Sequence, residues 1–318
     1  MGAHPGAEAV GIVQAAGESA AHLVGRCVLV PRLLPCGECD PCRRGRIAVC
    51  AGQRPRPLRP VARECLPARF LLPLEPPFVA AAPPPDTAWR YAALSDALLA
   101  PYSGLTRVGQ SPGGLCVVLG GGPRAAATVL IVRALGCQAA VLCPRPDERA
   151  LLCAPPYSAL TALDPAQHDA DSARRLLRDL ATTAGLPAHE LTILETTGSD
   201  AGRARALGLL ERGGTAILLD RSRPLDLSPD PTPLAAPLAA DPSIGGPAVL
   251  DRITNEQCQI LGAGPGHPDL LPELLALVER SQLDLTTLTR PLSLSAADTE
   301  LAAPPPRRRA PPPPPTPP

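Results

Sequence analysis

Four cysteines that lie close together in the sequence are the residues best suited to do chemistry. Cys36, Cys39, Cys42 and Cys50 follow the spacing C-x2-C-x2-C-x7-C. Thiolates two residues apart can bind one metal ion from both sides of a tight turn, and four such ligands complete the tetrahedral coordination of a structural zinc. Because no coordination position stays open, this zinc would support the fold and take no part in catalysis. The competing interpretation, a loop of free thiols, requires the matched spacings to arise by chance.

A glycine-rich turn within residues 117–128, VVLGGGPRAAAT, is the second candidate site. Gly120, Gly122 and Ala125 follow the pattern G-x-G-x-x-A, after a strand-like run and before a helical one. In a dinucleotide-binding turn the first glycine permits the tight turn and the second lets backbone N–H groups approach a pyrophosphate. The small third residue lets the helix pack on the strand. These three residues are therefore predicted to bind NAD or NADP.

Two features near this turn depart from the usual pattern. Pro123 has no N–H group, so one backbone donor to a phosphate is lost, although proline is well suited to a first helical turn. At the end of the next strand-like run an acidic residue usually binds the adenosine ribose, but here the matching position is Cys143 or Pro144, and Arg145 follows. Two interpretations stay open: Arg145 binds a 2′-phosphate, which predicts NADP, or it is a solvated loop residue and ribose recognition is lost. Asp147 is a weaker substitute for the missing carboxylate.

The composition restricts the class of protein. The chain has 318 residues and a formal net charge of zero, which argues against a broad surface for nucleic acid or for anionic membranes. The sequence has no apolar run of about 20 residues, the length of a membrane-spanning helix, and its start does not resemble a secretory signal. We therefore expect a cytoplasmic protein whose 11 cysteines are metal ligands or buried thiols and form no disulfide framework.

The pattern of the chain changes near residue 90. Residues 1–90 have the pattern of short strands and loops interrupted by proline and glycine, with the cysteine cluster at 35–50. Residues 91–285 alternate between helical and strand-like patterns, which predicts an α/β domain with a doubly wound parallel sheet. Residues 286–303 are expected to return to the first domain, and the proline-rich residues 304–318 to be disordered.

Individual elements follow from apolar periodicity. Residues 114–143 predict a strand, a glycine turn, a helix and a strand. Further helices are expected within 91–109, 172–185, 200–214 and 269–282. Further strands are expected within 8–17, 25–31, 68–74, 191–196, 215–220 and 255–264, and a long proline-rich loop over 221–250.

The cysteine cluster and its flanks, GAEAVGIV (6–13) and LVGRCVLVP (23–31), resemble the zinc-containing medium-chain dehydrogenase/reductase superfamily of the alcohol dehydrogenase type. Residues 30–53, 95–109 and 191–219 look most similar to the 6-hydroxycyclohex-1-ene-1-carbonyl-CoA dehydrogenases. The resemblance runs from about His4 to Ser295. It implies a partial GroES-like β domain, short at its start, joined to a Rossmann domain, with the four cysteines as the structural zinc lobe.

The same resemblance implies a second, catalytic zinc, which binds the substrate oxygen while hydride passes to or from a nicotinamide. Its usual ligands are an N-terminal Cys, the His of a G-H-E motif, and a Cys or Asp before the nucleotide domain. This chain has Ala7 at the histidine position, keeps Glu8 beside it, and has Asp96 at the third position. Glu8 and Asp96 are thus the predicted catalytic residues and, with His4, the candidate ligands of a catalytic zinc. Ala100 replaces a threonine often found near the nicotinamide.

Two functions follow from the resemblance. The first is an NAD(P)-dependent, zinc-containing oxidoreductase that acts, as a homo-oligomer, on a small-molecule alcohol or ketone or on a cyclic acyl-CoA. The first zinc ligand would lie before Met1, so a start further upstream would restore that ligand but not a histidine at Ala7. The second is a catalytically impaired paralogue that binds zinc or nucleotide without turnover, which the changes at Ala7, Ala100, Pro123 and Cys143 favour.

Overall fold

The computed structural model describes residues 8–55, 63–76, 79, 81–84, 86–110, 112–186, 191–219, 251, 253–264 and 266–289. His4, Ala7, the proline-rich loop at 221–250 and the proline-rich tail lie outside these residues, as does most of the expected return segment. Among the described helices, none is both long and apolar enough to cross a membrane.

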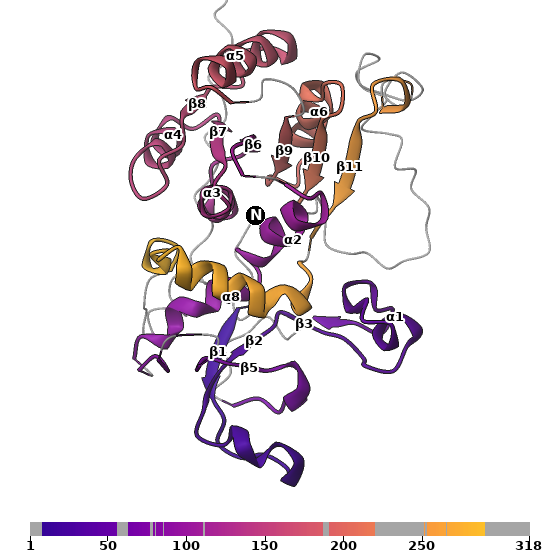
Figure 1. Cartoon of the computed structure of the whole chain (residues 1–318), viewed down its shortest axis with the longest axis vertical. Helices are drawn as coiled ribbons and strands as arrows, with labels where there is room; N and C mark the ends of the chain where they lie inside the picture. The colour runs from indigo at the N-terminus through magenta and orange to yellow at the C-terminus, as the bar shows by residue number, and fades with distance from the viewer. Residues whose placement is uncertain are drawn as a thin grey trace, which may run out of the picture.

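A parallel sheet, six-stranded within the described residues, forms the larger part of the molecule (Figure 1). Its strand order is β11-β10-β9-β6-β7-β8. Successive strands β6, β7 and β8 are added toward one edge of the sheet, and β9, β10 and β11 toward the other. This is the predicted doubly wound topology, with the reversal of strand order between β6 and β9. The strands are β6 (Leu115–Leu119), β7 (Gln138–Leu142), β8 (Thr161–Leu163), β9 (Thr192–Glu195), β10 (Thr215–Leu218) and β11 (Gln259–Gly262).

Helices cover both faces of this sheet because its central strands are apolar on both sides. Leu115 and Val117 of β6 belong to a core shared with α5 (Ala170–Thr183) and α6 (Asp200–Leu209). Cys116 and Val118 belong to the other core, which includes α2 (Leu99–Arg107), α3 (Pro123–Ala134), α4 (Pro146–Cys153) and α8 (Leu271–Arg280). Successive side chains of a strand point to opposite faces, which is why neighbouring residues of β6 lie in different cores.

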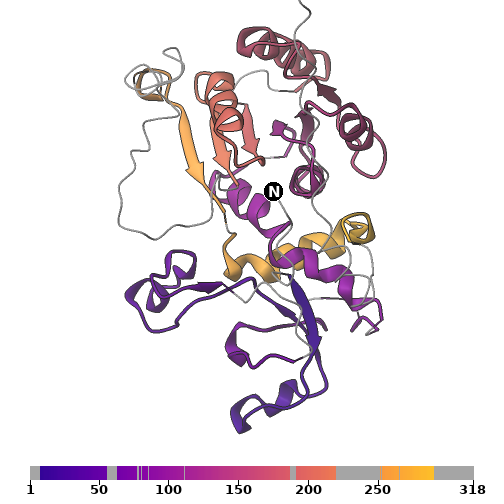
Figure 2. The same cartoon turned by 180° about the vertical axis from the view of Figure 1, so that it is seen from behind.

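A smaller antiparallel sheet lies on the other side of α8 in both views (Figures 1 and 2). Its order is β1 (Ala9–Ile12), β2 (Cys27–Val30) and β5 (Leu72–Pro73). The 3₁₀ helices η1 (Glu18–Leu23) and η3 (Ala68–Phe70) flank it, and η4 (Ala88–Ser95) joins it to the larger sheet. Ser95 donates a hydrogen bond to the carbonyl of Val30 at 2.7 Å, and the Tyr91 hydroxyl donates to Glu279 of α8 at 2.9 Å.

The structure differs from the sequence predictions in three places. The helix expected over 91–109 is interrupted, because Asp96 leaves the helical backbone conformation (φ −147°, ψ −58°) between η4 and α2. The strand expected over 68–74 is reduced to β5, in which Pro73 has no N–H group to extend the pairing. α4 and β8 were not predicted, and together they complete the far edge of the sheet.

Candidate functional site

The four cysteines of the cluster converge in one short lobe. Cys36 and Cys39 follow β3 (Leu33–Leu34), Cys42 lies in α1 (Asp40–Arg43), and Cys50 follows η2 (Ile47–Val49). All four Sγ atoms lie within 4.8 Å of one another, with separations of 3.5 Å for Cys36–Cys50, 3.7 Å for Cys39–Cys50 and 3.9 Å for Cys36–Cys42. Gly37, at φ +79°, forms the tight turn between the first two.

These distances fit a tetrahedral zinc ion. With Zn–S bonds of about 2.3 Å, the sulfurs of a regular tetrahedron are about 3.8 Å apart. Backbone N–H groups of Glu38 and Cys39 lower the pKa of Cys36 to about 6, which favours a thiolate. Loss of hydration and the neighbouring Cys39 thiol raise the pKa of Cys42 to about 12. Four thiolates therefore need a cation to coexist here, and zinc would supply that charge.

The glycine turn lies where the strand order of the large sheet reverses. Gly120 has φ +122°, and a Cβ there would come within 2.5 Å of Thr196 Oγ1. Gly122 is the N-cap of α3, no side chain caps this helix, and a Cβ at Gly122 would meet nothing within 4 Å. Open space before the N-terminus of a 12-residue helix suits a phosphate group. Ala125 is fully buried, which permits close packing of α3 on the sheet, and Pro123 is the first helical residue.

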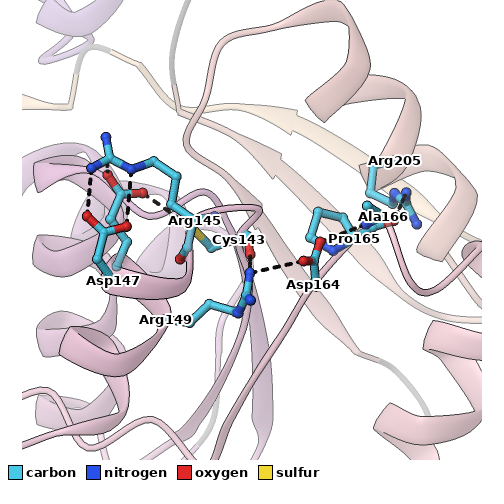
Figure 3. A network of polar contacts seen from close by, with 9 residues as sticks. Cys143, Arg145, Asp147, Arg149, Asp164, Pro165, Ala166 and Arg205 are labelled. Atoms are coloured by element: carbon cyan, nitrogen blue, oxygen red, sulfur yellow. Dashed lines mark hydrogen bonds and ion pairs between the residues drawn. The ribbon is translucent and has the colours of Figure 1, made fainter. Parts of the chain in front are cut away.

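A carboxylate from α4 reaches the end of β7 beside this turn. Glu148 lies so close to Gly121 that a Cβ on that glycine would come within 2.2 Å of the Glu148 Oε2. The thiol of Cys143 lies 3.2 Å from the same oxygen, and burial, with this carboxylate, raises the pKa of Cys143 to about 11. Arg145 pairs with Asp147 at 2.7 Å (Figure 3) and with Glu148 at 3.3 Å. The predicted ligand of a 2′-phosphate is thus already paired with two carboxylates.

A second set of contacts fixes the neighbouring strand ends (Figure 3). Arg149 donates to the carbonyl of Cys143 at 2.7 Å and pairs with Asp164 at 3.3 Å. Arg205 of α6 donates to the carbonyl of Pro165 at 2.8 Å. These contacts hold together the ends of β7 and β8 and the middle of α6.

Asp96 lies at the junction between the domain of the smaller sheet and the domain of the large parallel sheet. It is only 8% exposed, and its Oδ2 accepts hydrogen bonds from Arg32, which follows β2, and from Arg124 of α3, at 3.1 Å for the latter. Its Oδ1 is buried and has no hydrogen-bond partner within the described part of the chain. Glu8 accepts a hydrogen bond from the N–H of Ala97 at 2.8 Å. Burial, and then the charge of Asp96, raise the pKa of Glu8.

This arrangement does not fit a divalent metal ion. Two guanidinium groups, which stay protonated, contact the Oδ2 of Asp96, so a metal ion bound to the remaining oxygen, Oδ1, would lie beside two fixed positive charges. Among the described residues, a convergent group of three or more His, Cys, Asp or Glu side chains occurs in the cysteine lobe alone. The sequence predicted a catalytic zinc at Asp96 and Glu8, and the structure gives Asp96 arginine partners instead. The position of His4 stays a prediction, because it lies outside the described residues.

Three residues of these sites were not found from the sequence. Glu148 had a readable signal: it is the third residue of a helix that begins with proline, a position from which glutamate commonly reaches back toward the helix start. Arg32 and Arg124 had none, because their partner Asp96 is 64 and 28 positions away along the chain.

Comparisons with known proteins agree with this architecture. A family model described as "Alcohol dehydrogenase GroES-like domain" matches residues 1–62. A comparison with curated proteins gave no significant match. Solved structures that share the fold include the alcohol dehydrogenase TADH from Thermus sp. ATN1, at 21% identity and a TM-score of 0.65, over 89% of this chain and 75% of that one.

Two further solved structures of this fold are named with a cofactor or metals. The alcohol dehydrogenase rspB from E. coli CFT073, complexed with NADH, is 16% identical with a TM-score of 0.64, over 89% of this chain and 74% of that one. A cobalt- and zinc-bound alcohol dehydrogenase from Pyrobaculum aerophilum is 20% identical with a TM-score of 0.59, over 88% of this chain and 72% of that one. The chain therefore has the fold of these dehydrogenases: a GroES-like domain joined to a Rossmann-type sheet.

Proposed function

We propose that this protein is a dinucleotide-dependent oxidoreductase of the alcohol dehydrogenase type that carries one structural zinc. One observation carries the proposal. The first turn of α3, which follows the glycine turn, also bears Arg124, and Arg124 contacts Asp96 at the junction with the smaller sheet. A dinucleotide whose pyrophosphate rests at α3 would therefore lie beside the acidic residues of the junction.

The residues divide into two roles. Gly120, Gly122 and Ala125 would bind the pyrophosphate, and the bound NAD(P) supplies the hydride acceptor or donor. Asp96 and Glu8 are the proposed catalytic groups. Glu8 is suited to exchange a proton with a substrate hydroxyl, because burial raises its pKa above the ordinary value of a glutamate.

The substrate class follows from resemblance. The structures of this fold named above are alcohol dehydrogenases. An alcohol or ketone is accordingly the proposed substrate, and a cyclic acyl-CoA is the narrower proposal that comes from the sequence likeness to 6-hydroxycyclohex-1-ene-1-carbonyl-CoA dehydrogenases. A homo-oligomer in the cytoplasm, and the domain boundaries at residues 90, 285 and 303, belong to the same proposal.

A second function is favoured by a specific observation. The charge of Asp96 is neutralised by two arginines, and Arg145 is paired with two carboxylates. The proposed catalytic carboxylate and the predicted ligand of a 2′-phosphate are thus both engaged in internal ion pairs, which favours a protein that binds a nucleotide without turnover.

Two measurements on the full chain separate these functions. The first is titration of NADH and NADPH fluorescence with the protein. The second is the change in reduced-nicotinamide absorbance with a panel of alcohols, ketones and cyclic acyl-CoA thioesters. Binding with turnover supports the oxidoreductase, and binding without turnover supports the second function. Absence of nucleotide binding contradicts the oxidoreductase and restricts the second function to a zinc-binding protein without turnover.

A further inference from the structure

The junction cluster, defined as Arg32, Asp96, Arg124 and Glu8, joins segments that are far apart in the sequence. Arg32 and Glu8 flank strands of the smaller sheet, Asp96 ends η4, and Arg124 belongs to the helix that follows the glycine turn. Both arginines reach the same oxygen of Asp96. The cluster is therefore an ionic contact between the small sheet, η4 and the nucleotide-binding domain.

The side chains of the cluster are largely withdrawn from solvent. The exposed fraction is 27% for Arg32, 20% for Arg124 and 11% for Asp96. Ion pairs at such positions are screened less by salt than exposed pairs. Removing Asp96 takes from both arginines the carboxylate that they share, and removing one arginine leaves Asp96 with the other alone. Either change reduces the compensation of charge in a poorly hydrated place, which is unfavourable.

A metal ion at this position would meet two obstacles. The described donors near Asp96 are two carboxylates, whereas a catalytic zinc takes three protein ligands from neutral or anionic groups. A doubly charged ion on Asp96 would also lie against two guanidinium groups, which cannot lose their protons to make room for it.

We propose that Arg32 and Arg124 take the place of a catalytic metal in this protein. The protein then binds a single zinc ion, in the cysteine lobe, and the junction between its domains is held by guanidinium–carboxylate contacts. The positive charge beside the nucleotide turn is supplied by Arg124 in place of a second zinc. This inference concerns metal content and does not depend on turnover, so it can fail or hold independently of the proposed function.

The zinc content per chain tests this proposal directly. The full chain, purified without a metal-affinity tag, is incubated with excess zinc sulfate, desalted and subjected to elemental analysis. One zinc per chain is expected in the wild type and in Asp96→Asn. Asp171→Asn is the matched control, since it removes a carboxylate from the exposed pair with Arg174, and it should also keep one zinc.

A separate control tests whether the single zinc ion is bound in the cysteine lobe. Cys39→Ser is expected to lose the zinc, and release of the wild-type zinc by a thiol-modifying reagent gives the same information if that variant does not fold. A second zinc in the wild type that Asp96→Asn lacks would overturn the proposal.

Thermal unfolding tests whether the junction cluster stabilises the protein. Asp96→Asn and Arg124→Met should each lower the melting temperature, and the double variant should lower it by clearly less than the sum, because both single changes remove the same contact between Arg124 and Asp96. Additive shifts in melting temperature would show that Asp96 and Arg124 do not stabilise each other, and would contradict their contact in the junction cluster.

Discussion

Glu148→Gln tests whether a carboxylate from α4 recognises the adenosine ribose. Its side chain is 20% exposed and its carboxylate lies against Gly121, next to the glycine turn. The Asp147 side chain, 65% exposed, pairs with Arg145. A ribose diol can donate hydrogen bonds to a carboxylate at this edge, whereas a 2′-phosphate would be repelled by it. The geometry therefore predicts that the protein prefers NADH to NADPH.

The magnitude follows from the chemistry of the substitution. A hydrogen bond to a charged group contributes about 1.5–3 kcal/mol and one between neutral groups about 0.5–1.5 kcal/mol. The glutamine side chain still accepts a hydrogen bond, so the variant loses only the difference in free energy between a charged and a neutral hydrogen bond. That difference, about 1–1.5 kcal/mol, corresponds to about five- to twelvefold weaker NADH binding. NADPH binding should strengthen, because Arg145 then keeps one carboxylate partner instead of two.

Fluorescence titrations with NADH and NADPH measure both effects. Asp147→Asn is the matched control: it removes the same charge from an exposed pair, and its NADH affinity should change by less than about threefold. Unchanged NADH binding by Glu148→Gln would refute the assignment. So would an equal loss in both variants, because the effect would then report net charge and not a contact with the ribose.

The remaining predictions concern the turn, the zinc and a buried carboxylate. Gly121→Ala should lower the free energy of unfolding by about 1–3 kcal/mol in urea titrations, because its Cβ would meet Glu148 and the buried Cys143. Gly122→Ala should cost less than about 1 kcal/mol, since it meets no clash and loses only the advantage of glycine over alanine as an N-cap, yet it should weaken NADH binding. A larger loss of stability in Gly122→Ala than in Gly121→Ala would contradict this. Chelation of zinc should lower the melting temperature, and re-addition should restore it; an unchanged transition would argue against a structural role for the metal.

Burial raises the pKa of Glu195 above its ordinary value of 4.5, although hydrogen bonds from Thr197 and Gly198 oppose the shift. Its stabilising contribution is then largest below that value and is lost as the pH rises through the higher folded-state pKa. Urea titrations across this range should show that Glu195→Gln gains stability relative to wild type with rising pH, and a constant difference would show that Glu195 does not titrate differently in the folded protein.

The sequence by itself determined the features that depend on local spacing. Cys36 and Cys50 are 14 positions apart, so a short lobe with two tight turns is enough to bring all four thiols together. The glycine turn is equally local, since a strand, a turn and a helix in succession place Gly120, Gly122 and Ala125 at one helix start. The alternation of strands and helices indicated the doubly wound sheet for the same reason.

Only the tertiary structure decided what surrounds Asp96 and Arg145. The sequence placed a candidate metal ligand at residue 96, but it carried no sign that Arg32 and Arg124 would reach it. Ion pairs across such separations leave no periodic trace, because a charged side chain on a surface and one turned into a junction look alike in the sequence. The pairing of Arg145 with Asp147 and Glu148 likewise depends on how α4 begins and how closely it approaches the glycine turn. Short-range spacing therefore fixed the zinc lobe and the nucleotide turn, and packing between distant segments fixed the charges that act beside them.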